Sequence, residues 1–287
     1  MTLPLNRPIL SRYILYRHLA SGGMADIYEA NDFVVNKDVA IKFLKEKSLK
    51  NEYELELFKN EARYAAIFNH PHIMKIYNVG EYEGQPFVSY ELLKGKTLKE
   101  VLDERGKLSF DEVIDYMLQI LDGVDALHER EIIHNDLKPD NLFIVRDGTI
   151  KIVDFGIASH IYSKEQKETL GSVNYVAPEV LISKKRSYQS DIYSCGIILF
   201  ELLTGRVPFE GAHSGEVINQ LLKNDVPSIK KYTNISNIED FDYIVNKATN
   251  KVNSNRYKTV KEFIADLNRL KRHERVKKSN VFTRWFK

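Results

Sequence analysis

The sequence predicts an α+β protein of two lobes, a small strand-rich lobe carrying one helix and a larger helical lobe. Up to about residue 93, alternating apolar and polar residues with many β-branched side chains predict strands around one helical segment. Beyond that point, apolar residues recur at helical spacing, and several segments open on Ser, Thr or Asp, which are common helix N-caps. A chain of 287 residues is long enough to bury a core in each lobe.

The expected strands of the first lobe cover residues 13–20, 25–32, 38–45, 73–82 and 85–92. The helix among them lies within 51–69 and ends before His70-Pro71, because a residue that precedes proline avoids the helical conformation. The second lobe is expected to hold helices at 98–105, 109–130, 189–205, 214–224, 238–250 and 259–272.

Composition narrows the class of protein. Hydrophobic residues make up 43% and charged residues 29%, which is ordinary for a globular protein. A net charge of +2 gives no reason to expect a nucleic-acid partner. The single cysteine, Cys195, excludes an intrachain disulfide. Because the N-terminus lacks the apolar core of a signal peptide, we expect a cytoplasmic location.

The segment 132–156, IIHNDLKPDNLFIVRDGTIKIVDFG, carries most of the chemistry. Asp147-Gly148 predicts a two-residue hairpin turn. That register places Arg146 opposite Thr149, Ile144 opposite Lys151 and Asn141 opposite Asp154. An amide and a carboxylate at the same end of two strands suit Mg²⁺, which prefers oxygen ligands. Asp136 and Lys138 precede them on a loop and supply a carboxylate base and a cation for phosphate.

This segment resembles a known family pattern. HNDLKPDN followed by DFG is similar to the catalytic loop and metal-binding motif of protein kinases, with VAIK upstream and APE downstream in the family's order. GGM and NHPHIMKIY point to bacterial serine/threonine kinases of the eukaryotic-like type. The resemblance implies a bilobal kinase fold over 13–271. Its lobes are 13–93 and 94–271, between an N-terminal extension, 1–12, and a basic tail, 272–287.

The resemblance also implies the roles of the reacting groups. Lys42 would hold the α- and β-phosphates of ATP, and Glu61 would fix the direction of Lys42. Asp136 would orient the substrate hydroxyl and accept its proton, while Lys138 would neutralise charge on the γ-phosphoryl. The metal ligands would be Asn141 and Asp154, with Mg²⁺ as the ion and Mn²⁺ as an alternative.

The same matching places the nucleotide. Apolar side chains would cover the two faces of the purine: Leu19, Ile27 and Ala40 above it, and Phe143 and Val153 below it. Main-chain groups of the hinge residues Glu91 and Leu93 would form hydrogen bonds with adenine. Tyr90 occupies the gatekeeper position beside the hinge. The phosphate lid would run through Ala20, Ser21, Gly22 and Gly23.

The lid departs from the family's G-x-G-x-x-G pattern. Ala20, Gly22 and Ala25 stand at the three glycine positions, so only the middle glycine is kept, and Gly23 is extra. Gly22 is where the backbone must come closest to phosphate. We therefore expect weaker nucleotide affinity but no loss of chemistry.

Lys138 and the segment GSVNYVAPE resemble serine/threonine kinases rather than tyrosine kinases. Position 135 is Asn, where regulated kinases carry an arginine that pairs with a phosphorylated loop residue, and Ser159 adds no positive charge. We therefore expect activity to depend weakly on phosphorylation of the activation loop. The candidate phosphosites are Ser163, Thr169 and Ser172.

Three further residues would support the helical lobe by the same resemblance. Asp191 would anchor the catalytic loop, and Glu179 would pair with Arg256. Tyr193 stands where the family usually has tryptophan.

The partners implied are protein substrates, with a weak homodimer as an alternative that the resemblance allows. The basic tail is either a solvated helix end or a segment that docks onto an acidic membrane surface or into a partner groove. The chain is either a soluble kinase or a kinase domain cut from a longer protein. A pseudokinase that acts as a scaffold and a small-molecule phosphotransferase are the competing functions.

Overall fold

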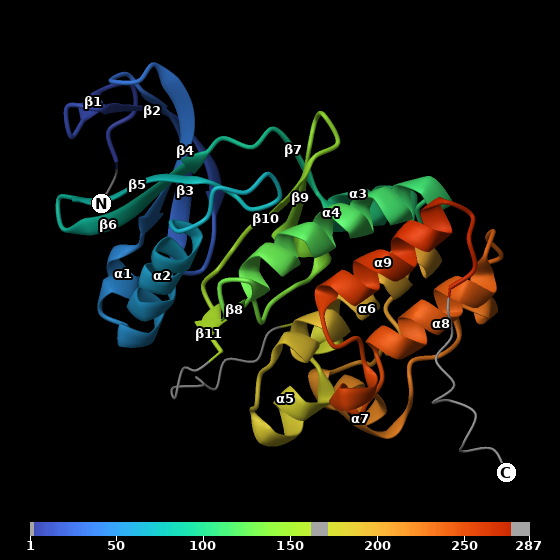
Figure 1. Cartoon of the computed structure of the whole chain (residues 1–287). Coiled ribbons are helices and arrows are strands. Elements are labelled where there is room, and N and C mark those ends of the chain that lie inside the picture. Colours follow the sequence, from blue (N-terminus) through green and yellow to red (C-terminus); the bar gives the residue numbers. More distant parts are fainter. Residues whose placement is uncertain (1–2, 162–171, 277–287) are drawn as a thin grey trace, which may run out of the picture. The chain divides into compact units, whose positions relative to one another are not determined.

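The computed structural model describes residues 3–161 and 172–276 (Figure 1). It confirms the expected α+β fold, with a strand-rich unit and a helical unit. The first unit consists of Met1–Lys96 and Phe143–Ser159, and the second of Thr97–Leu142 and His160–Lys287. The domain boundaries given above remain predictions.

A six-stranded sheet with the order β1-β2-β3-β4-β6-β5 forms most of the first unit. Its antiparallel strands are β1 (Pro8–Ile9), β2 (Tyr13–Ser21), β3 (Ala25–Asp32), β4 (Lys37–Leu44), β5 (Ile76–Tyr82) and β6 (Gln85–Glu91). β4 pairs with β6 so that Ala40 lies opposite Tyr90 and Lys42 lies opposite Val88. Because side chains alternate between the faces of a strand, Lys42 and Tyr90 share one face of the sheet.

Two helices follow β4, α1 (Glu46–Leu49) and α2 (Glu52–Ala65). α2 begins where the side chain of Asn51 accepts hydrogen bonds from the main-chain N–H groups of Tyr53 and Glu54. Its buried positions, Phe58, Glu61, Ala62 and Ala65, recur at helical spacing and form one face. That face also carries Glu61, the acidic residue that the family resemblance pairs with Lys42.

The segment 143–159 belongs to the first unit, although helices of the second unit precede it in sequence. It contains β10 (Ile150–Ile152) and most of β9 (Leu142–Val145), which join β7 (Gly95–Thr97) in a three-stranded sheet. The main chain of Ile152 accepts from Met74 at 3.0 Å and donates to His72 at 2.9 Å. The Lys151 ammonium lies 2.8 Å from the Glu91 carboxylate.

The expected register of the β9–β10 hairpin was wrong by one residue. The N–H of Val145 donates to the Thr149 carbonyl at 2.8 Å, and the N–H of Gly148 donates to the Val145 carbonyl at 2.9 Å. The loop therefore has three residues, Arg146 to Gly148, instead of two. Gly148 takes a φ of 86°, the left-handed conformation that ends a three-residue hairpin loop.

The helical unit contains α3 (Leu98–Arg105), α4 (Phe110–His128), α5 (Pro178–Ser183), α6 (Tyr188–Thr204), α7 (Ser214–Lys223), α8 (Ile238–Ala248) and α9 (Val260–Lys271). Short strands β8 (Ile132–Ile133) and β11 (Ser159–His160) and four single 3₁₀ turns connect the described parts.

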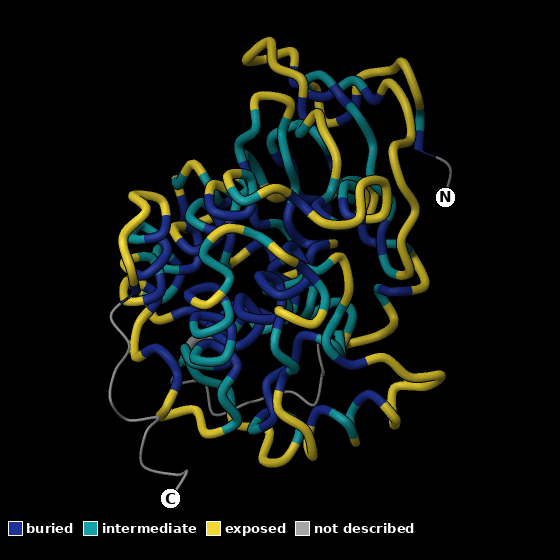
Figure 2. The backbone as a smooth tube through the Cα atoms, turned by 90° about the vertical axis from the view of Figure 1, so that its right-hand side faces the viewer, coloured by how far each residue is buried: buried dark blue, intermediate teal, exposed yellow. Residues whose placement is uncertain are grey.

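α6 is the central helix of this unit. Every residue from Ser190 to Leu203 is buried, which accounts for the continuous apolar run CGIILFELL. Figure 2 shows buried backbone running through the interior of the helical unit and exposed backbone at its margin. No helix in the described ranges has the length and apolar character that crossing a membrane requires.

Candidate active site

The sheet and α2 bring Lys42 and Glu61 together in the first unit. The Lys42 ammonium donates to Glu61 Oε2 at 2.6 Å, and Glu61 is 2% exposed. Burial alone would lower the pKa of Lys42, but the charges of Glu61 and Asp154 outweigh it and hold that pKa above its ordinary value. The ammonium therefore stays charged and keeps a fixed direction, as a group that binds phosphate must.

Asp154 lies at the end of the hairpin segment, in the left-handed conformation with a φ of 64°. Its Oδ1 accepts the N–H of Gly156 at 3.1 Å. The next residue, Phe155, is fully buried and stacks on Phe68 with ring centroids 6.4 Å apart. The left-handed backbone of Asp154 is thus held by the hydrogen bond of its own side chain and by the buried ring of the residue that follows.

The residues expected around adenine all belong to this unit. Of these, Leu19 is exposed, while Ile27, Ala40, Phe143 and Val153 are half-buried. The N–H of Glu91 donates to the Lys75 carbonyl at 3.0 Å and is therefore not available to a base. The main chain of Leu93 forms no hydrogen bond with any other residue that the structure describes. Its donor and acceptor are thus free for a purine edge.

A polar clamp that the sequence analysis missed holds the lid turn between β2 and β3. The Lys45 ammonium donates to Ser21 Oγ and to the Gly22 carbonyl, both at 2.7 Å. Asp26 accepts from Ser21 Oγ at 2.6 Å and lies 3.3 Å from Lys45. Burial alone would raise the pKa of Asp26, but the Ser21 and Lys45 hydrogen bonds outweigh it and lower that pKa. This lid clamp consists of Ser21, Gly22, Asp26 and Lys45.

In the helical unit, a loop before the turn Pro139–Asn141 presents Asp136. Its Oδ2 accepts from the Lys138 ammonium at 2.9 Å and from Asn141 Nδ2 at 3.0 Å. Its Oδ1 accepts the main-chain N–H of Ser172 at 3.1 Å. The structure therefore brings together four residues expected from the sequence, Asp136, Lys138, Asn141 and Ser172.

Asp191 on α6 anchors the main chain of this loop. Its carboxylate accepts the main-chain N–H groups of His134 and Asn135, at 2.9 and 3.0 Å, and lies 2.8 Å from His128 Nε2. Asn135 has a φ of 69°. Asn is one of the few non-glycine residues that adopt this left-handed conformation at low cost.

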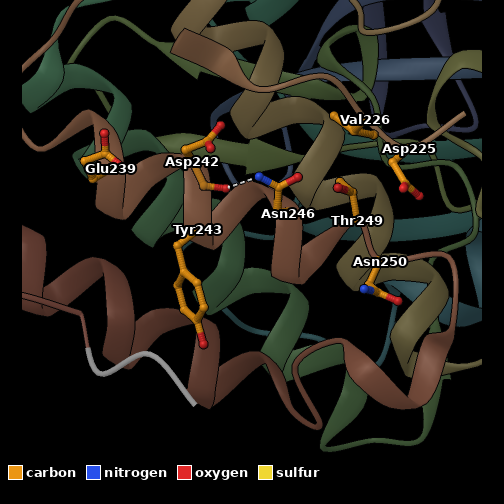
Figure 3. A pocket seen from close by; sticks show the side chains of 8 residues that line it. All are labelled: Asp225, Val226, Glu239, Asp242, Tyr243, Asn246, Thr249 and Asn250. Carbon is orange, nitrogen blue, oxygen red and sulfur yellow. Dashed lines mark hydrogen bonds between the residues drawn. The ribbon is translucent and has the colours of Figure 1, made fainter. Parts of the chain in front are cut away.

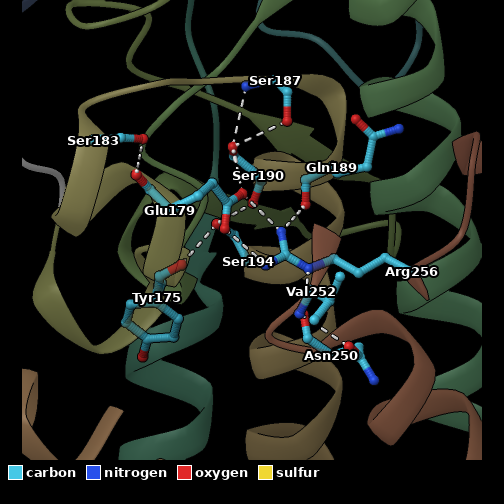
Figure 4. Close-up of polar contacts among 10 residues, drawn as sticks. All are labelled: Tyr175, Glu179, Ser183, Ser187, Gln189, Ser190, Ser194, Asn250, Val252 and Arg256. Carbon is cyan, nitrogen blue, oxygen red and sulfur yellow. Dashed lines mark hydrogen bonds and ion pairs between the residues drawn. The ribbon is translucent and has the colours of Figure 1, made fainter. Parts of the chain in front are cut away.

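Glu179, which is half-buried, and Arg256, which is buried, form an ion pair in the same unit, as Figure 4 shows. The two guanidinium Nη atoms each donate to one Glu179 oxygen at 2.8 Å, and Nε donates to the Asn250 carbonyl at 2.7 Å. The guanidinium also lies 4.9 Å from the ring centre of Tyr193. Tyr193 thus supplies an aromatic face for the cation.

A cavity of about 340 Å³ opens beside α8 (Figure 3). It is lined by Asp225, Val226, Glu239, Asp242, Tyr243, Asn246, Thr249 and Asn250. None of the residues that the sequence predicts for nucleotide or metal lines this cavity. Two of the predicted phosphosites, Ser163 and Thr169, and the aromatic end of the basic tail lie outside the described residues.

The lysine–glutamate pair of the first unit and the loop aspartate network of the second are the chemical elements of a phosphotransferase. A family model for the protein kinase domain matches residues 13–286, and the chain belongs to this family. The family uses ATP together with a divalent metal ion.

Three relatives give the degree of similarity. Serine/threonine-protein kinase PrkC of Bacillus subtilis is 36% identical over 92% of this chain and 41% of its own length. The probable serine/threonine-protein kinase PknB of Lactococcus lactis is 37% identical over 89% of this chain and 41% of its own. Serine/threonine-protein kinase PknL of Mycobacterium tuberculosis is 33% identical over 92% and 67%. The chain thus spans less than half the length of the first two.

Proposed function

We propose that the chain is a serine/threonine protein kinase that transfers the γ-phosphoryl group of ATP to hydroxyls of protein substrates and of itself. The observation that carries this proposal is the environment of Asp136, whose carboxylate receives hydrogen bonds from Lys138, Asn141 and the main chain of Ser172. Serine/threonine kinases are also the relatives that the chain resembles over most of its length.

In this proposal Asp136 accepts the proton of the substrate hydroxyl. The Lys138 ammonium, 2.9 Å from Asp136, neutralises charge on the group being transferred. Ser172 fixes the orientation of the carboxylate through its N–H. Lys42, whose direction Glu61 fixes, binds the α- and β-phosphates, which are not transferred. Positioning and charge neutralisation are the main contributions that a protein makes to phosphoryl transfer.

The lid favours a phosphate ligand. A Cβ placed on Gly22 would lie 3.5 Å from the Ala25 carbonyl, an ordinary contact, and one on Gly23 would meet nothing. Neither glycine has a positive φ. The described residues therefore do not require glycine at either position. We propose that the two glycines are there because the absence of a side chain lets a phosphate group approach the backbone.

We propose that Asn141 and Asp154 hold the divalent ion, with Mg²⁺ as the physiological metal. Asn141 uses its amide nitrogen on Asp136, and its Oδ1 has no hydrogen-bond donor among the described residues. Oδ2 of Asp154 likewise has no described donor. Both atoms are hard oxygen ligands of the kind that Mg²⁺ prefers. The ion, when bound, offsets negative charge on the phosphates.

Transfer from radiolabelled ATP tests the proposal, with casein and the chain itself as acceptors and phosphoamino-acid analysis of the product. Asp136→Asn is the matched control, because it keeps the size of the side chain and removes the proton acceptor. We expect label on serine and threonine with the wild type and at least about 100-fold less with the variant. Equal transfer by the two proteins would overturn the proposal.

Other expectations from the sequence stay proposals. These are a cytoplasmic location, a weak homodimer and a contact between the basic tail and an acidic membrane surface.

A further inference from the structure

Glu61 receives two hydrogen bonds, one at each carboxylate oxygen. Lys42 donates to Oε2 at 2.6 Å, and the hydroxyl of Tyr90 donates to Oε1 at 2.6 Å. Glu61 is 2% exposed and Tyr90 is 3% exposed. Lys42 and Tyr90 are the only hydrogen-bond donors to this carboxylate within the described ranges.

The location of the Tyr90 hydroxyl is fixed by its ring. Tyr90 and Lys42 project from the same face of the sheet, toward α2. The ring packs in an apolar cluster with Leu44, Phe58, Ala62 and Val88. Because this packing fixes the ring, it also fixes the position of the hydroxyl. The hydroxyl lies against Glu61 Oε1, the carboxylate oxygen that does not accept from Lys42.

The hydroxyl remains a donor across the working pH range. Burial raises the pKa of Tyr90 well above its ordinary value, and the negative charge of Glu61 raises it further. The bond from Tyr90 to Glu61 is therefore charge-assisted and stronger than a bond between neutral groups. It ties β6 to α2 independently of the lysine.

We propose that Tyr90 is a positioning residue for phosphoryl transfer: its hydroxyl fixes the Glu61 carboxylate, and through it the Lys42 ammonium, in the arrangement that receives phosphate. This role is separate from the size of the side chain at position 90, which phenylalanine would preserve. The inference rests on the proposed kinase function and names a further residue of that site.

The first experiment compares Tyr90→Phe with Tyr13→Phe. Tyr13 is a matched control because it is also fully buried in the first unit, where its hydroxyl accepts from Asn78 Nδ2 at 3.0 Å. We expect Tyr90→Phe to lower kcat about tenfold with less than about a threefold change in the KM for ATP, since the contacts to adenine do not involve Glu61. We expect Tyr13→Phe to lower Tm about as much as Tyr90→Phe does and to leave kcat unchanged.

A double-mutant cycle then identifies the partner. If Tyr90 acts through Glu61, Tyr90→Phe has less than about a twofold further effect on kcat in a Glu61→Gln background. Losses that multiply in the double variant would show that Tyr90 acts independently of Glu61 and would overturn the inference. Equal kcat for wild type and Tyr90→Phe would also overturn it. A wild-type protein that transfers no label instead refutes the kinase function itself, so the two failures are distinct.

Discussion

The guanidinium of Arg256 is completely buried and meets the Glu179 carboxylate through two parallel hydrogen bonds of 2.8 Å. Glu179 lies in the first turn of α5, and Arg256 immediately follows the 3₁₀ turn before α9. A paired geometry of this kind requires the planar fork of arginine, because the single ammonium of lysine cannot reproduce it. The pair therefore joins segments that are far apart in sequence.

Arg256→Lys is expected to lower the free energy of unfolding by about 2–4 kcal/mol, because the half-buried carboxylate of Glu179 is left incompletely paired. Urea unfolding followed by circular dichroism measures the change. Arg272→Lys is the control, since Arg272 and Glu274 form an ion pair on the surface. If both variants unfold at the same urea concentration, Arg256 does not stabilise the helical unit in this way.

The acidic limb of the stability profile is expected to depend on Glu112. Hydrogen bonds from Arg105 and Ser109 lower the pKa of Glu112 from its ordinary 4.5 to about 2. Because the pKa is lower in the folded state, its contribution is present above pH 4.5 and is lost as the pH falls toward about 2. Glu112→Gln should cost about 1 kcal/mol near neutral pH, a value reduced by solvent screening.

Thermal unfolding of wild type and Glu112→Gln at a series of pH values measures this dependence. The two Tm curves should converge between about pH 4.5 and about pH 2. A constant difference across that range would show that the carboxylate charge does not contribute.

The lid clamp is expected to govern affinity for ATP. Lys45→Ala removes the two hydrogen bonds that the ammonium donates to Ser21 and Gly22, so the turn gains freedom and the KM for ATP rises about three- to tenfold with kcat nearly unchanged. Lys50→Ala, an exposed lysine that follows α1, is the control. Ala20→Gly should change KM modestly in the opposite direction, because it restores a glycine of the family pattern. An unchanged KM in Lys45→Ala would show that the clamp does not order the lid.

Activity is expected to be nearly independent of phosphorylation on the activation loop. Asn135 places no cation beside Asp136, so a loop phosphate has no arginine to neutralise at that position. Ser163→Ala and Thr169→Ala should each retain kcat within about threefold of the wild type. Mass spectrometry confirms that the sites are unmodified in the variants. A large loss in Thr169→Ala, with Tm unchanged, would contradict this expectation.

Periodicity was enough to locate the long elements. The strands at Tyr13–Ser21 and Ala25–Asp32 and the helix at Leu98–Arg105 lie where the sequence places them, within one residue at each end. Short elements were not expected, among them β1, α1 and α5, because segments of two to six residues contain too little of a period to recognise.

The parts of the site that sequence could not predict depend on contacts between distant residues. The Asp-Gly pair correctly indicated a hairpin, but choosing between a two- and a three-residue loop requires the hydrogen bonds of Val145. The sequence placed Tyr90 beside the hinge without indicating its contact with Glu61, and it gave no role to Lys45. Their partners lie 29 and 24 residues away, and no local pattern connects them.

The division of the chain into units has a consequence for synthesis. The first unit is discontinuous, because it needs Phe143–Ser159 to pair with His72, Met74 and Glu91. The ribosome must therefore make more than half of the chain before this unit can be complete. Until then, the sheet that carries Lys42 lacks the hairpin that carries Asp154. No single contiguous piece of the gene encodes the first unit, so truncation after Lys96 would not yield it.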